Sequence, residues 1–117
     1  MASIPTVDID LEETQKYILV SVTGAALAAP VTVIRGRAAA EFHADVLAAC
    51  EAALTAGAGA GAALDALGGG RITFSPPSTY RVHGYSVAFG KGDHAAAAAA
   101  LRAALPGATV THDDEGY

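Results

Sequence analysis

Three runs of β-branched and aromatic residues in the first third of the chain predict strands. Residues 4–10 alternate weakly and contain a proline, which cannot donate to a sheet ladder, so we expect an edge strand or an extended arm. Residues 16–23 predict the clearest strand, because they are rich in β-branched and aromatic side chains and end at a glycine. Residues 31–36 predict a third strand, and residues 25–30 predict a loop before it.

Two later stretches have the spacing of helices. In residues 41–56 apolar side chains recur every three or four positions, while acidic side chains fall outside that stripe. Gly57 then predicts the C-terminal stop of this helix. Residues 94–105 predict a second helix, because Asp93 suits its N-cap, alanine is the strongest helix former and a Pro-Gly pair follows.

The middle of the chain has a weaker pattern. Three glycines in residues 57–67 disfavour a helix by about 1 kcal/mol each relative to alanine, which favours a loop followed by a strand near residues 60–67. The run Gly68-Gly69-Gly70 predicts a turn or a bulge. Further strands, with a Pro-Pro-Ser hairpin loop between the first two, are predicted at residues 71–75, 80–89 and 108–112.

These elements predict an α/β (α+β) fold, with a single mixed β-sheet flanked by two main α-helices. The chain has 117 residues, which fits one domain over residues 1–117 and allows about two-thirds of the unfolded surface to be buried. Alanine accounts for 29 of these residues, so the core must rely on a small set of larger side chains.

Composition and charge argue against several classes of protein. A single cysteine permits neither an intramolecular disulfide nor a thiolate zinc cage, and Cys50 is expected to be a small buried hydrophobe. The net charge of −5 argues against a nucleic-acid-binding surface. The longest apolar run is far shorter than the roughly 18 residues of a membrane span, and the N-terminus lacks the pattern of a signal peptide. We therefore expect a cytoplasmic monomer that binds neither nucleic acid nor membranes.

Candidate chemistry centres on one histidine. The chain has no nucleotide-binding or hydrolase motif of defined spacing, and no two of its four histidines lie four residues apart as metal ligands on a helix do. A lone histidine is more often structural than catalytic, but His43 falls near the start of the first predicted helix. Free N–H groups and the positive end of the helix dipole bind anions there. On such an exposed helix end the dipole is expected to lower the pKa of the imidazole, so that it can accept a proton from water.

The seven lysines and arginines are spread over the chain. In an acidic protein most such side chains are solvated surface groups with weak ion pairs. If some of them converge in the fold, they would neutralise a phosphoryl group, but sequence spacing alone cannot show such convergence.

The order of several motifs resembles the 14 kDa phosphohistidine phosphatase family (Janus/Ocnus), and the resemblance covers nearly the whole chain. The motifs that carry it are Lys16-Tyr17-Ile18-Leu19, Ile34-Arg35-Gly36, Phe42-His43-Ala44-Asp45, Leu67-Gly68-Gly69-Gly70-Arg71-Ile72, His83-Gly84-Tyr85-Ser86-Val87-Ala88-Phe89-Gly90, Asp93-His94-Ala95 and Gly116-Tyr117.

The resemblance implies metal-independent removal of phosphate from phosphohistidine in proteins, with no cofactor and with histidine-phosphorylated proteins as partners. By motif match, His43 takes the place of the catalytic proton acceptor and Lys16 that of the substrate-binding lysine. The other positions that match the phosphate site are Arg35, Ala44, Arg71, Ser86, Val87 and Ala88. His94 matches a further histidine, with a supporting role at most.

Two routes and two other functions remain open at this point. His43 either accepts the proton of an attacking water or attacks phosphorus directly and forms a phosphoenzyme. The chain could instead be a non-catalytic phosphoprotein-binding or regulatory module, because fold and pocket do not guarantee turnover. A hydrolase of phospholysine and small phosphoramidates would keep the same site but take another substrate.

Overall fold

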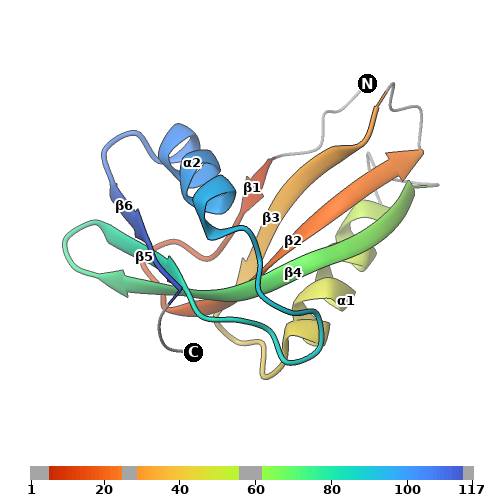
Figure 1. The fold of residues 1–117 in the computed structure, drawn as a ribbon, viewed down its shortest axis with the longest axis horizontal. Coiled ribbons are helices and arrows are strands. Elements are labelled where there is room, and N and C mark those ends of the chain that lie inside the picture. Colours follow the sequence, from red (N-terminus) through yellow and green to blue (C-terminus); the bar gives the residue numbers. More distant parts are fainter. Residues whose placement is uncertain (1–5, 25–28, 56–61, 115–117) are drawn as a thin grey trace.

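A mixed sheet of six strands forms the centre of the computed structural model, which describes residues 6–24, 29–55 and 62–114 (Figure 1). The strands lie in the order β1-β3-β2-β4-β5-β6. The elements are β1 (Val7–Asp8), β2 (Gln15–Gly24), β3 (Val31–Arg37), α1 (His43–Thr55), β4 (Ala62–Ser75), β5 (Thr79–His83), α2 (His94–Ala104) and β6 (Thr109–His112).

The sheet is mixed, as the sequence predicts. β1 pairs with β3 and β5 pairs with β6 in parallel, whereas the inner pairs β2–β3, β2–β4 and β4–β5 are antiparallel. β1 is the expected edge strand, and β6 is the expected last strand at the opposite edge. The fold class predicted from the sequence is therefore confirmed.

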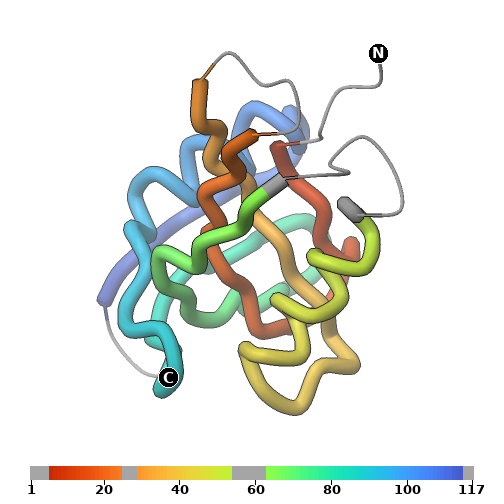
Figure 2. Tube along the Cα trace, turned by 90° about the vertical axis from the view of Figure 1, so that its right-hand side faces the viewer, coloured from red at the N-terminus to blue at the C-terminus, as the bar shows by residue number. Residues whose placement is uncertain are grey.

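The helices cover opposite faces of this sheet, because the side chains of β2 alternate between them. Tyr17 and Leu19 pack with Leu101 of α2, whereas Ile18 and Val20 pack with Val46 of α1. We call these the α2 face and the α1 face. Figure 2 shows the strands running between the two helices.

Cys50 of α1 is 1% exposed within the α1-face cluster, as expected of a small buried hydrophobe. Large side chains of both faces are fully buried although alanine dominates the composition. In the described part of the chain no helix has the length and apolar character needed to cross a membrane.

β4 differs most from the sequence prediction. It is one strand of 14 residues that continues through Gly68, Gly69 and Gly70, where the sequence predicts a turn or a bulge between two strands. A register shift opposite Leu19 and Val20 confirms the bulge, but there is no turn. β4 pairs with the full length of β2, and this pairing outweighs the weak strand propensity of glycine.

β5 is shorter than predicted, because the chain leaves the sheet at Gly84, whose φ is 79°. The predicted strand over residues 80–89 is therefore wrong beyond His83. The loop 84–92 returns to the free edge of β4 instead. The N–H of Gly69 donates to Gly90 O at 3.0 Å, and the N–H of Gly92 donates to Gly69 O at 2.9 Å.

Both helix starts are anchored by an aspartate. Asp93 is the N-cap of α2, as predicted, and its Oδ1 accepts from the N–H of Ala96 at 3.0 Å. α1 begins at His43, two residues later than predicted, and Asp45 Oδ2 accepts from the N–H of Phe42 at 3.0 Å. Most of the predicted loop 25–30 and the stop at Gly57 lie outside the described residues.

Candidate functional site

The ring of His43 lies against the backbone of β4. Its Nε2 donates to the carbonyl oxygen of Gly70 at 2.8 Å, and the side chain is 5% exposed. A Cβ at residue 69 would lie 3.1 Å from His43 Cδ2 and would overlap the carbonyl oxygen of Tyr17. Glycine at this position therefore lets the imidazole rest on the sheet. The expectation that His43 lies on an exposed helix end is wrong, because its ring packs against the glycines of β4 and is buried.

Burial lowers the pKa of His43, and the nearby charges of Lys16 and Arg71 lower it further, against the opposing effect of the Gly70 hydrogen bond. The direction of this pKa shift agrees with the sequence prediction, but burial and the nearby cations cause it. A carbonyl oxygen only accepts, so Nε2 carries the proton of the neutral ring and Nδ1 keeps its lone pair. Nδ1 is therefore the ring nitrogen that is able to accept a proton.

Two cations lie side by side on the α1 face. Lys16 of β2 pairs in register with Arg71 of β4, and on its other side with Arg37 of β3. Lys16 and Arg71 line a small cavity of about 170 Å³. Arg37 is held by Asp8, with Nη2 at 3.0 Å from Oδ2. Lys16 and Arg71 therefore converge in the fold, which sequence spacing alone could not show.

A second cavity, of about 400 Å³, opens beside His43. Phe42, His43 and Ala44 line it from the start of α1, and Val87 and Ala88 line it from the loop 84–92. These two segments lie next to each other at the lower edge of Figure 1. Four of the residues predicted for the site therefore meet in one pocket, although more than 40 positions separate the two segments.

Backbone donors also gather at this pocket. The N–H groups of His43, Ala44, Val87 and Ala88 have no acceptor among the residues that the structure describes. Ser86 differs, because its N–H donates to Gly90 O at 3.1 Å and its Oγ accepts from Phe89 at 3.0 Å. Ser86 thus shapes the turn, while its own amide is occupied.

The structure does not bring Arg35 to either cavity. Its side chain is 4% exposed, lies beside Cys50 under α1 and donates from Nη1 to Ile34 O at 2.9 Å. Burial lowers the pKa of this guanidinium, and the neighbouring Cys50 opposes that effect. Arg35 therefore packs α1 onto the sheet.

His94 lies on the α2 face and is hydrogen-bonded to the start of the loop 84–92. The hydroxyl of Tyr17 is hydrogen-bonded to His94 Nδ1, and His94 Nε2 donates to Gly84 O at 2.7 Å. Burial raises the pKa of Tyr17, and the charge of Asp93 adds to this effect, so the hydroxyl keeps its proton and donates. This chain of hydrogen bonds ties the start of the loop to β2.

Three contributors escaped the sequence analysis: Tyr17, which orients His94; Phe42, whose ring is 62% exposed at the pocket; and the glycines of β4. The triple glycine was the available signal, because glycine inside a strand marks a close approach by another group. A Cβ at Gly70 would lie 2.7 Å from His94 Cε1, so two imidazoles approach β4 from opposite faces.

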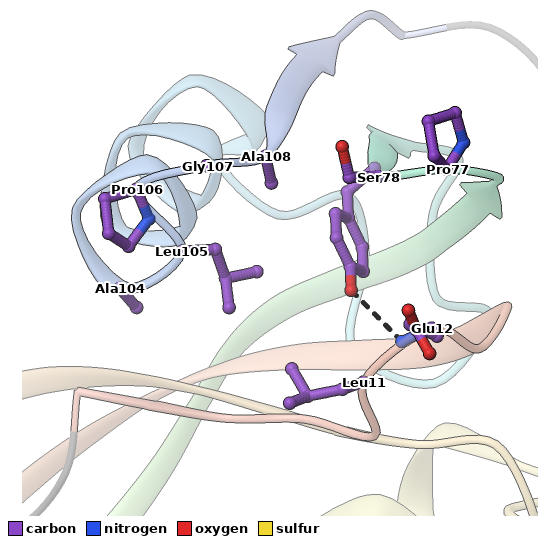
Figure 3. A pocket seen from close by; sticks show the side chains of 10 residues that line it. Leu11, Glu12, Pro77, Ser78, Ala104, Leu105, Pro106, Gly107 and Ala108 are labelled. Atoms are coloured by element: carbon purple, nitrogen blue, oxygen red, sulfur yellow. Dashed lines mark hydrogen bonds between the residues drawn. The ribbon is translucent and has the colours of Figure 1, made fainter.

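Other features of the described residues lie apart from this site. No three His, Cys, Asp or Glu side chains among them are grouped as a metal site would require. A cavity of about 520 Å³ lies at the C-terminal end of α2, where Leu11 and Leu105 face it (Figure 3). Beside it the hydroxyl of Tyr80 accepts from the N–H of Glu12 at 3.0 Å.

Comparison with known proteins gives relatives along the whole chain. A sequence model of the Janus/Ocnus family matches residues 1–109. The chain is 38% identical over 122 residues to the sex-regulated protein janus-A of Drosophila pseudoobscura pseudoobscura, covering 100% of this chain and 80% of that protein. It is 35% identical over 123 residues to the 14 kDa phosphohistidine phosphatase of Homo sapiens, covering 100% of this chain and 96% of that protein. The similarity thus extends well beyond the residues around His43.

Proposed function

Because this chain belongs to the Janus/Ocnus family, we propose that it is a protein phosphohistidine phosphatase that hydrolyses the P–N bond of phosphohistidine, with His43 as the proton acceptor. One observation carries the proposal: His43, whose Nδ1 keeps a lone pair, lies close to Lys16 and Arg71 and lines a pocket together with residues whose backbone N–H groups are available as donors.

The phosphoryl group is held by charge and by backbone donors. Its transition state is loose and spreads negative charge over three oxygens, so oriented donors stabilise it without covalent help. Lys16 contributes a point charge, and Arg71 contributes a planar guanidinium suited to two parallel hydrogen bonds. The N–H groups of Ala44, Val87 and Ala88 complete the set.

His43 acts on the attacking water. The water oxygen bonds to phosphorus while Nδ1 takes its proton, the P–N bond breaks, and its electron pair stays on the leaving nitrogen. A proton then returns from the imidazolium to that nitrogen, so the enzyme ends unchanged. The carbonyl of Gly70 stabilises the imidazolium, because the Nε2–H that points at it becomes a stronger donor when the ring is charged.

Direct attack by Nδ1 on phosphorus uses the same geometry and gives a phosphoenzyme. Rapid quenching during turnover of a labelled substrate distinguishes the routes. Labelled phosphate trapped on His43 would establish direct attack. Product release without an initial burst, from an enzyme that carries no labelled phosphate, supports the water route.

The proposal is tested by phosphate release from a histidine-phosphorylated protein. His43→Ala is expected to lower kcat by about 10²–10⁴-fold, the usual contribution of a positioned acid–base group. Because His43 is buried, thermal unfolding of the variant must show that it folds. Release at near the wild-type rate by a folded variant would contradict the assignment. Metal-independent hydrolysis further predicts no effect of a chelator.

A regulatory module is the second candidate, because the similarity to janus-A is at least as high as that to the phosphatase. Such a module would bind a histidine-phosphorylated protein through the same cations and donors. Tight binding without phosphate release would favour it over the enzyme.

A further inference from the structure

His43 has both charged and apolar neighbours. The charges of Lys16 and Arg71 both lower the pKa of His43 and are therefore close to it. The pocket beside His43 is lined, besides His43 itself, by side chains without a polar atom, those of Phe42, Ala44, Val87 and Ala88. In the proposed function the cations and the backbone N–H groups of the pocket take the phosphoryl oxygens, so the group bonded to phosphorus meets the apolar side chains.

We propose that Phe42 and Val87 form a binding wall for the imidazole ring of the phosphorylated histidine, so that the site selects an aromatic leaving group over an alkyl amine. This inference rests on the proposed function and specifies which P–N substrates the site accepts.

The chemistry of the leaving group supports this choice. Imidazole, with an ordinary pKa of about 6.5, departs as a flat neutral ring, whereas the amine of lysine, at about 10.4, takes a positive charge at neutral pH. Apolar walls disfavour a charge that has no partner, and an aromatic ring packs favourably on another ring. The wall therefore favours phosphohistidine over phospholysine.

The wall consists of exposed side chains on backbone segments that hydrogen bonds hold in place. Phe42 is 62% exposed and Val87 is 80% exposed, so neither side chain is part of the core. Their backbones are nevertheless held, because the N–H of Phe42 donates to Asp45 and the turn of Val87 is closed by the Ser86–Gly90 pair. Substitution of either side chain should therefore leave the fold intact.

Three substrates and three variants test the wall. The substrates are a histidine-phosphorylated peptide, the same peptide with phospholysine, and phosphoramidate, which has no ring or alkyl chain. Phe42→Ala is expected to raise KM for the phosphohistidine peptide about fivefold, in line with the usual value of an aromatic pair, and to leave phosphoramidate unchanged. Phe42→Tyr should keep the wild-type KM. Phe42→Leu keeps apolar area without a ring and should lose selectivity for histidine over lysine.

Leu11→Ala is the matched control. Leu11 is 61% exposed, almost as much as Phe42, but it lines the other cavity (Figure 3). It should change none of the three KM values.

Equal losses on all three substrates for Phe42→Ala would overturn the inference, because Phe42 would then act by placing His43. Unchanged values on all three would overturn it as well. The Kd of the same peptides is also measured for the slow His43→Ala variant, with and without Phe42→Ala. If the wild-type protein releases no phosphate, the proposed function fails, and an unchanged Kd in this second comparison would separately reject the wall.

Discussion

His43 shows how one imidazole acquires its properties from its surroundings. The residue is buried against Gly69 and Gly70, and its Nε2 is committed to a carbonyl. Burial and two cations lower its pKa, so the neutral ring is the main form at neutral pH. Single side chains around it have separable tasks, because Lys16 and Arg71 supply charge whereas Phe42 supplies apolar surface.

The lowered pKa predicts the pH dependence of both activity and stability. The proposed mechanism requires the basic form of His43, so kcat/KM should rise with pH and level off with a midpoint below 6.5, the ordinary value for histidine. The folded protein binds this proton less tightly than the unfolded chain does. The contribution of His43 to stability is therefore complete above pH 6.5 and is lost as the pH falls through the lowered folded value.

Lys16→Ala tests the cation next to it. The KM for a histidine-phosphorylated peptide should rise, because a charge that is proposed to bind the phosphoryl group is lost. The midpoint of the pH profile should move upward only slightly, because burial lowers the pKa of His43 more than Lys16 does. An unchanged KM would remove Lys16 from the site.

Among the elements, β4 has the largest effect on the site. Its glycines leave room on both faces, so that His43 rests on one side and His94 on the other. Its edge beyond β5 also holds the loop 84–92 through the hydrogen bonds of Gly69. One strand thus contacts both segments that line the pocket, the start of α1 and the loop 84–92.

Gly69→Ala should displace His43. The added Cβ would lie 3.1 Å from His43 Cδ2 and would overlap the carbonyl of Tyr17, so strand and ring must move apart. We expect a loss of about 1–3 kcal/mol in stability, measured by denaturant unfolding, and a fall in kcat. Gly107→Ala is the control, because its Cβ would meet nothing within 4 Å. Equal effects of the two substitutions would contradict this account of β4.

Across the molecule, hydrogen bonds link the two faces of the sheet. Tyr17 of β2 binds His94 at the start of α2, and His94 binds Gly84, where the loop of the pocket begins. The α2 face, which has no part in the proposed chemistry, thereby orients the loop that reaches the other face.

Tyr17→Phe tests this link. The variant keeps the ring but leaves His94 Nδ1 buried without its donor, which should reduce stability by about 1–3 kcal/mol. The KM for a histidine-phosphorylated peptide should also rise, because the loop 84–92 loses an anchor. Tyr80→Phe removes a hydroxyl that accepts from Glu12 at the other cavity and should leave KM unchanged. A Tyr17→Phe protein with normal KM would limit the pair to a structural role.

Local patterns determined much of this protein before any contact was known. The β-branched runs predicted β2 and β3, Asp93 predicted the start of α2, and the ordered motifs indicated the family. The site roles that the same motifs give to His43 and Lys16 stay predictions. Helix caps and periodicity depend on neighbouring residues, and the order of the motifs is read directly along the chain, so none of these features needs a tertiary contact.

Contacts between distant residues decided the rest. The pairing of β4 with all of β2 turned a predicted turn into a strand, and the glycine surface buried a histidine that was expected to be exposed. Arg35 lies beside Cys50 under α1 and not at the proposed phosphate site. These outcomes depend on which segments pack together, since propensity and spacing say nothing about what a side chain meets across the sheet.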